Sequence, residues 1–244
     1  MVAKRTVLVT GGTGKVGRAI VDGILSMGDK VILAVRDVEN ATALINEYNW
    51  SQIDCVPHAL DLLHSEGFEN LERFQIDAVI HCARTLDSLQ IEADLSVSRD
   101  NWLLEMTLGV IAPYELSRVL RKGSKLKDVI FISSMYGMVG PTPRLYADFE
   151  KSSPVQYGVV KAAQLHLVKE LAVRFAPIRV NAVSYGGFKG RTDIPFEQRY
   201  SELTPLGRML SEKDVFGPIE LILKNPDMAM TGQNIVVDGG WTVW

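Results

Sequence analysis

The sequence predicts a doubly wound α/β fold, in which a parallel sheet of about seven strands lies between two layers of helices. Short β-branched runs alternate with longer segments of helical periodicity along the chain. Parallel strands joined by crossover helices require this alternation. No repeat, low-complexity tract or Gly/Ser/Pro-rich linker interrupts it. We therefore expect residues 1–244 to form one domain.

The expected strands are short runs rich in Val, Ile and Leu. They are residues 6–10, 30–35, 53–58, 77–83, 128–133, 178–183 and 234–237. The segments between them carry apolar residues at helical spacing, so each expected helix covers one face of the sheet. These helices are residues 16–27, 38–48, 65–73, 98–121, 155–175 and 212–223. The ligand crevice should lie just beyond the carboxyl ends of the strands.

Composition indicates a globular protein with a sizeable core, since 47% of the residues are hydrophobic and 23% are charged. With a net charge of -3, we expect neither nucleic acid nor an anionic membrane as a general partner. No apolar stretch is long enough to cross a bilayer, and no charged leader precedes the first strand. Cys55 and Cys82 lie in apolar runs typical of buried strands rather than of a disulfide framework. We expect a cytoplasmic protein in a reducing compartment.

A glycine-rich turn, residues 10–17, follows the first expected strand and opens the first expected helix. Gly11 permits the tight turn, Gly14 lets backbone amides approach a pyrophosphate, and Gly17 lets the helix pack closely on the strand. The positive end of the helix favours the bound anion. The alternative is an ordinary glycine turn. The predicted cofactor contacts in this turn are Gly11, Thr13, Gly14, Lys15, Val16 and Gly17.

The ends of the second and third strands predict how the adenosine half of a dinucleotide is held. Arg36 follows Val35, at a position where a carboxylate would select NAD and an arginine pairs with the 2′-phosphate of NADP. NADP(H) is therefore favoured over NAD(H), although the adjacent Asp37 would favour NAD if the turn shifted by one residue. After the third strand, we place Asp61 at the adenine edge and Leu62 against the adenine face. The alternative for Asp61 is a helix cap.

A serine and a Tyr-x-x-x-Lys pair predict proton-transfer chemistry at the crevice. Ser134 closes the fifth strand, and Tyr157 and Lys161 share one face at the start of the helix 155–175. A free phenol, with a pKa of about 10, is a poor proton carrier at neutral pH. A nearby ammonium stabilises the phenolate, and Ser134 can donate a hydrogen bond to a substrate oxygen.

These motifs stand in the order found in the short-chain dehydrogenase/reductase family, which the chain resembles over nearly its whole length. Further family-like segments are residues 161–163, 178–184, 205–208 and 231–241. The resemblance implies a Rossmann-type sheet, a nicotinamide cofactor, hydride transfer between a carbonyl and an alcohol, and a homodimer or homotetramer. It implies that Tyr157 is the acid/base, that Lys161 tunes it and holds the nicotinamide ribose, and that Ser134 orients the substrate carbonyl. The further implied cofactor contacts are Cys82, Ala83, Gly186, Gly187 and Thr192. No metal is expected.

Three positions depart from the family pattern. Gly109 stands at the position of the family's catalytic Asn, which puts the proton relay through Lys161 in doubt. Arg84 stands where family members have Gly, and we interpret it either as a phosphate ligand or as a solvated cation. Tyr185 replaces a Pro beside the expected nicotinamide wall. Gly109 and Arg84 support a second hypothesis, a dinucleotide-binding sensor or partner subunit with weakened catalysis.

The residues between Ser134 and Tyr157 predict the kind of substrate. Segment 138–153 is expected to be irregular and to form a substrate rim, with a solvated insertion as the alternative. Its polar and aromatic side chains favour a small polar substrate. The length of the segment resembles that of family members acting on sugars or sugar nucleotides, which implies a substrate of this kind. A sugar-nucleotide epimerase or dehydratase is a third hypothesis, weakened because the chain ends without a further substrate domain. The helix 155–175 is apolar around much of its circumference, which predicts self-association.

Overall fold

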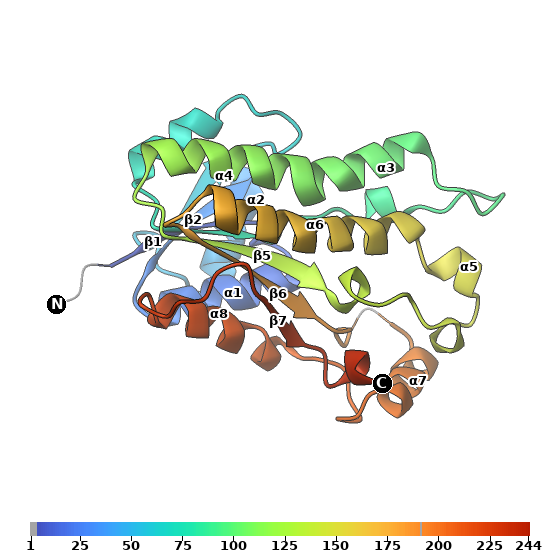
Figure 1. Ribbon diagram of the computed structural model, residues 1–244. Coiled ribbons are helices and arrows are strands. Elements are labelled where there is room, and N and C mark those ends of the chain that lie inside the picture. Colours follow the sequence, from blue (N-terminus) through green and yellow to red (C-terminus); the bar gives the residue numbers. More distant parts are fainter. Residues whose placement is uncertain (1–3, 191) are drawn as a thin grey trace.

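The computed structural model describes residues 4–190 and 192–244 and confirms the predicted fold class. Within these residues, seven parallel strands form one sheet in the order β3-β2-β1-β4-β5-β6-β7 (Figure 1). The strands are β1 (Thr6–Thr10), β2 (Lys30–Val35), β3 (Cys55–Ala59), β4 (Ala78–His81), β5 (Asp128–Ser134), β6 (Arg179–Tyr185) and β7 (Asn234–Val237). The strand order reverses between β1 and β4, and doubly wound sheets bind ligands beyond the strand ends at such a point.

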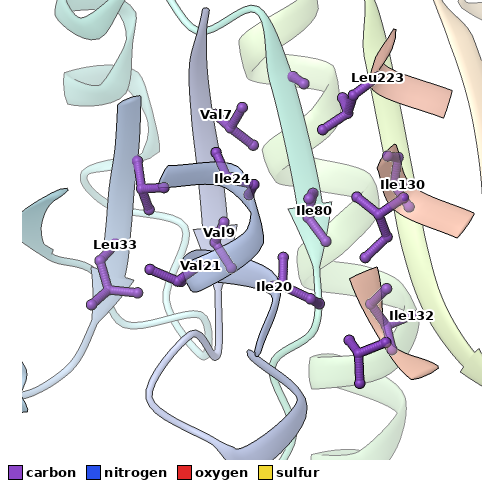
Figure 2. Packing of buried hydrophobic residues seen from close by; sticks show 14 of the residues in the cluster. Val7, Val9, Ile20, Val21, Ile24, Leu33, Ile80, Ile130, Ile132 and Leu223 are labelled. Atoms are coloured by element: carbon purple, nitrogen blue, oxygen red, sulfur yellow. The ribbon is translucent and has the colours of Figure 1, made fainter. Parts of the chain in front are cut away.

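One face of the sheet is covered by three helices, α1 (Lys15–Ser26), α2 (Val38–Glu47) and α8 (Phe216–Lys224). Ile20, Val21 and Ile24 of α1 belong to the core cluster formed with the β-branched residues of the central strands (Figure 2). Gly23 lets α1 and α8 meet closely, because a Cβ at this position would lie 2.1 Å from the ring of Phe216. The last helix was predicted from the sequence to span residues 212–223. Instead a 3-10 turn, Glu212–Asp214, precedes α8.

The other face is covered by α4 (Ala112–Gly123) and α6 (Val155–Arg174), and α3 (Arg99–Met106) lies on the same side of the sheet. These helices lie above the sheet in Figure 1, and α3 packs on α6. The prediction of one continuous helix over 98–121 was wrong, because a π-helical segment, Thr107–Ile111, separates α3 from α4. Pro113 explains the break: it has no N–H to donate to the carbonyl of Gly109 one turn earlier.

Several shorter elements differ from the sequence-based expectations. The helix expected over 65–73 is a 3-10 helix, Phe68–Phe74. Segment 138–153 is not wholly irregular, since it contains the 3-10 turn Pro143–Leu145 and the short helix α5 (Phe149–Ser152). Helix α7 (Ile194–Leu203) was missed, although Asp193 caps it and Pro195 stands in its first turn. Further 3-10 turns are Asp87–Leu89, Met135–Gly137 and Trp241–Val243.

The segments that follow β5 and β6 gather beyond the carboxyl ends of the strands. Figure 1 shows α5, α7 and the C-terminus together at this end of the sheet. Tyr200 of α7 stacks on Trp241 with ring centroids 4.6 Å apart, so the last turn of the chain helps to hold α7 in place. Among the described helices, none has both the length and the apolarity needed to cross a membrane.

Candidate active site

A groove runs along the carboxyl edge of the sheet, in two halves of about 380 and 290 Å³ that share Gly11, Thr13 and Arg84. The first half is also lined by the predicted residues Arg36, Asp61, Leu62 and Ala83. The second half is also lined by Gly14, Lys15, Val16, Gly17, Cys82, Ser134, Tyr157, Lys161 and Gly186. Two predicted residues lie outside this lining. Gly187 packs under the ring of Tyr200, and Thr192 Oγ1 lies 3.9 Å from Met209 Sδ.

The glycines of the phosphate turn are required by close backbone contacts. A Cβ at Gly11, where φ is +68°, would lie 2.5 Å from Ala83 Cα, and a Cβ at Gly17 would lie 2.2 Å from Gly11 O. Gly14, which has no side chain, is the N-cap of α1, and no acidic residue stands in the first turn of the helix. The first amides of α1 therefore point toward the groove without a side-chain partner, as anion binding requires.

Thr10 ties the end of β1 to the segment after β4. Its Oγ1 accepts hydrogen bonds from the backbone N–H groups of Cys82 and Ala83, at 3.2 and 3.3 Å. The β4 strand ends at His81, so Cys82 lies just past the strand and not within it as predicted. Both cysteines are free thiols, and burial raises the pKa of Cys82 to about 11.

The first half of the groove is lined by two exposed cations, Arg36 and Arg84, and by three carboxylates, Asp37, Asp61 and Asp87. Asp37 caps α2 by accepting the N–H of Asn40 at 2.9 Å, so its carboxylate already has a backbone partner. Asp61 lines the groove and also caps a turn, accepting the N–H of Leu63 at 3.0 Å. This backbone hydrogen bond, together with His64 3.3 Å away, lowers the pKa of Asp61. Both interpretations of Asp61 thus agree with its position.

Ser134, Tyr157 and Lys161 converge on the second half of the groove. Ser134 is buried at the end of β5, and its Oγ accepts the N–H of Tyr136 at 3.2 Å. Tyr157 is half-buried, and the Nζ of Lys161 lies 5.9 Å from the centre of its ring. The sequence order therefore identified three side chains that the fold brings to one place.

Lys161 is almost fully buried, with 7% of its surface exposed. Burial lowers its pKa to about 8, an effect strengthened by the charge of Arg84 and opposed by that of Glu105. Its Nζ donates to Ile132 O at 2.9 Å and to Gln164 Oε1 at 3.0 Å. Sequence reasoning missed Gln164, which lies on the same buried face of α6 one turn after Lys161.

Arg84 is exposed and also lines the groove, so its position is compatible with both a solvated cation and a phosphate ligand. Its guanidinium carbon lies 4.8 Å above the ring of Tyr157, and its side chain lines both halves of the groove. Tyr185 lines the second half of the groove, but its hydroxyl donates to the carbonyl of Val215. The hydroxyl of Tyr185 is therefore occupied in the core, and only its ring contributes to the groove wall.

A third cavity, of about 680 Å³, opens beside Tyr157 and shares that residue and Arg84 with the groove. Its wall is mainly apolar and aromatic, and includes Leu89, Tyr136, Met138, Val139, Pro141, Tyr146 and Phe149. The hydroxyls of Tyr136 and Tyr146 lie 2.8 Å apart and hydrogen-bond each other. Segment 138–153 thus borders a cavity next to Tyr157, whereas its cations Arg144 and Lys151 are exposed and do not line it.

A buried polar cluster holds the segment after β4 against α3 and α6. Ser88 Oγ donates to the carboxylate of Glu105, and Gln156 Nε2 donates to Ser88 O at 2.6 Å. All three residues are buried. Because Gln156 precedes Tyr157 directly, this cluster fixes the first turn of α6 and with it the position of the phenol.

Comparison with known proteins agrees with this arrangement. A family model described as enoyl-(acyl carrier protein) reductase matches residues 15–242. The chain belongs to the short-chain dehydrogenase/reductase family. An oxidoreductase of Bacillus subtilis, YmfI, is 28% identical over 254 residues that cover 97% of this chain and 98% of its own. The post-translational flagellin modification protein A of Campylobacter coli is 25% identical over 255 residues, covering 99% of both chains.

Among solved structures of short-chain dehydrogenases, the one from Leptospira borgpetersenii with bound NAD+ superimposes with a TM-score of 0.81 at 27% identity. The match covers 98% of this chain and 93% of the other. The protein is therefore an NAD(P)-dependent oxidoreductase of this family. Its own residues fit a dinucleotide, because the glycine cradle, the free amides of α1 and the two halves of the groove form one path from Arg36 to Tyr157.

Proposed function

We propose that the protein interconverts a carbonyl and an alcohol by hydride transfer, with Tyr157, Lys161 and Ser134 as its catalytic residues and NADP(H) preferred to NAD(H). The position of Tyr157 is the observation that carries this proposal. Its side chain borders both the groove and the cavity of about 680 Å³, with a buried ammonium on its inner side. A dinucleotide in the groove and a carbonyl compound in the cavity would meet at this phenol.

The three catalytic side chains have different roles in the transfer of the proton and in the positioning of the substrate. Bound NADP(H) would supply the hydride in reduction and accept it in oxidation. Tyr157 Oη gives a proton to the carbonyl oxygen in reduction and takes it back from the alcohol in oxidation. The ammonium of Lys161 stabilises the phenolate left behind. Ser134 Oγ donates a hydrogen bond to the same substrate oxygen and so holds it beside Tyr157 Oη.

The preference for NADP(H) is supported by the charges at the far end of the groove. Arg36 is exposed there, and Asp37, the carboxylate that would select NAD, already caps α2. Guanidinium groups bind phosphate oxygens through charge-assisted hydrogen bonds. A ribose 2′-phosphate would therefore gain a partner at Arg36.

Substitution of Arg36 by Ala is expected to weaken NADPH binding about 10- to 100-fold and to change NADH binding by less than about twofold. Intrinsic fluorescence titration with each cofactor gives the two dissociation constants. Arg174→Ala, which removes an exposed arginine from the far end of α6, is the matched control. Wild-type protein that binds NADH more tightly than NADPH would overturn the role of Arg36.

The cavity lining narrows the substrate class. Arg84 and the hydroxyls at its inner end favour a carbonyl compound with a polar group near the reacting carbon. The apolar and aromatic wall favours an apolar portion further out, which differs from the purely polar substrate suggested by the composition of segment 138–153. A sugar ring stacked on the aromatic residues is the second candidate.

A panel that pairs keto-sugars with amphipathic ketones and keto-acids distinguishes these substrates. NADPH oxidation is followed by absorbance, and we expect higher kcat/KM for the amphipathic compounds. Higher values for the keto-sugars would assign the aromatic wall to sugar stacking. Tight NADPH binding without turnover of any compound would favour the alternative function, a sensor or partner subunit.

We also propose that the protein self-associates through the outer face of α3, α4 and α6. Val155 and Val159 on α6 are 58% and 46% exposed, and Leu103, Ile111 and Tyr114 expose apolar surface on the neighbouring helices. Light scattering at micromolar concentration is expected to give a dimer or tetramer, and Val159→Glu to shift it toward the monomer. A monomeric wild-type protein would contradict this proposal.

A further inference from the structure

The ammonium of Lys161 has three N–H donors, and the structure gives a partner to two of them. One donates to Ile132 O on β5 at 2.9 Å, and one donates to Gln164 Oε1 on α6 at 3.0 Å. Because Lys161 also lines the groove, the third donor is left for the groove side, where Tyr157 lies. The direction of this third donor depends on the two partners that hold the other two.

The side-chain amide of Gln164 can accept a hydrogen bond from Lys161 in only one orientation. Its Nε2 donates to Gly109 O at 2.7 Å, while its Oε1 accepts from Lys161. An ammonium only donates and a carbonyl only accepts, so a flipped amide would lose both hydrogen bonds. Gln164 is 3% exposed and has no water-facing alternative. The oxygen of its amide is therefore held toward Lys161.

The carbonyl that orients Gln164 is made available by the break between α3 and α4. In a regular α-helix the carbonyl of Gly109 would accept the N–H of residue 113, but Pro113 has none. The π-helical segment Thr107–Ile111 contains this carbonyl. A Cβ at Gly109 would lie 2.3 Å from Val160 Cγ1, so the packing of Val160 excludes a larger residue here. Position 109 thus offers a backbone carbonyl, and the side-chain amide comes from Gln164.

We propose that Gln164 is a positioning residue of the active site, which links the carbonyl of Gly109 to the ammonium of Lys161 and aims that ammonium at Tyr157. The proposal rests on the proposed function only in giving Lys161 a catalytic task. The amide group that position 109 lacks is thereby supplied by a side chain of another helix, α6.

The charge of Lys161 is set by its neighbours on every side. Arg84 faces it from the segment after β4 and Glu105 from α3, while Cys82 lies at the end of β4 and Tyr157 on its own helix. Since Gln164 Oε1 accepts a hydrogen bond from the charged form, it favours that form and raises the pKa of Lys161 relative to a protein without it.

Titration of Lys161 tests the proposal without a substrate or a cofactor. The Cε and Nζ chemical shifts of lysine-labelled protein are followed by NMR between about pH 6 and 10, and Lys161→Met assigns the signal. The wild-type pKa lies at about 8. Gln164→Leu is expected to lower this pKa and Gln164→Glu, which places a carboxylate against the ammonium, to raise it. Each shift is expected to be about one unit.

The matched control is Asn181→Leu, which likewise replaces a buried side-chain amide, but on β6, where it donates to Met230 O and accepts the N–H of Gln233. It should lower the melting temperature without moving the Lys161 titration. Circular dichroism reports folding. If Gln164→Leu does not fold, Gln164→Glu, which differs from the wild type in a single group, still tests the sign. A Lys161 pKa unchanged in the folded Gln164 variants would overturn the proposal.

Turnover on the best compound of the panel provides a second readout. We expect Gln164→Leu to lower kcat about 10- to 100-fold with KM changed by less than about threefold, because the ammonium acts in the proton-transfer step. Gln164→Glu should recover part of the loss, since it restores an acceptor. If the proposed function is wrong, the Tyr157→Phe variant will keep wild-type turnover. This result does not depend on the titration of Lys161.

Discussion

Tyr157→Phe is expected to lower kcat on a true substrate by about 10³-fold and to leave NADPH binding unchanged. The substitution removes one oxygen, the group that we propose exchanges a proton with the substrate. The ring itself should stay in place, because Arg84 lies 4.8 Å above it and the ring of Tyr136 lies 6.5 Å away. A loss of this size therefore reports on chemistry rather than on packing.

The measurement is steady-state NADPH oxidation with the best compound of the substrate panel, together with fluorescence titration of NADPH. Tyr48→Phe is the matched control, since Tyr48 ends α2 away from the groove and exposes 40% of its surface. Turnover in Tyr157→Phe within about threefold of the wild type would remove Tyr157 from its role. NADPH binding lost together with turnover would assign Tyr157 to cofactor binding.

The free energy of unfolding is expected to fall steeply in acid, in part because of His81. In the His81→Asn variant, the part of this decrease that comes from His81 is expected to be absent. His81 ends β4 with 4% of its surface exposed, its Nε2 lies 2.8 Å from Ser117 Oγ, and its ring is tilted against the ring of Phe131. Burial lowers its pKa from 6.5 to about 3. The unfolded chain thus takes up a proton between these two values that the folded protein does not.

Stability is therefore lost as the pH falls from 6.5 toward about 3, at about 1.4 kcal/mol per pH unit and about 5 kcal/mol in total. Urea unfolding at about pH 7 and pH 4.5 measures the effect, and the wild type should lose about 3 kcal/mol more than His81→Asn over this interval. Comparing the two proteins cancels the titration of carboxylates that they share. The control is His166→Asn, at an exposed histidine of α6, which should keep the wild-type dependence. Equal pH dependence of His81→Asn and the wild type would contradict a neutral buried His81.

Much of the fold could be predicted from patterns within contiguous segments of the sequence. The β1 and β2 strands lie where they were expected, because short β-branched runs between glycine turns and amphipathic segments have few alternative structures. The prediction of one continuous helix over 98–121 was wrong for a local reason that is visible in the sequence. Pro113 marks the π-helical break, but a strong apolar period on both sides of it concealed the interruption.

Some residues of the candidate site were likewise predictable from the sequence, and others were not. Strand-end positions and a four-residue spacing predicted Ser134, Tyr157 and Lys161, since the carboxyl ends of parallel strands meet at one edge of the sheet. Gln164 and the stacking of Arg84 on Tyr157 gave no such signal, because each depends on a partner that is close only after folding. Thr192 was placed by analogy in a segment whose path the sequence does not determine, and its hydroxyl lies near Met209 instead.

By itself, the sequence determined the α/β class, the family and the order of the glycine turn, the serine and the Tyr-x-x-x-Lys pair, because periodicity and motif spacing are properties of contiguous chain. The tertiary structure decided which acceptors hold the ammonium of Lys161, which residues line the cavity beside Tyr157, and which side chain meets the carbonyl of Gly109. These features arise from side chains on separate elements. Hydrogen-bond geometry and packing select such pairs only when the strands and helices are assembled.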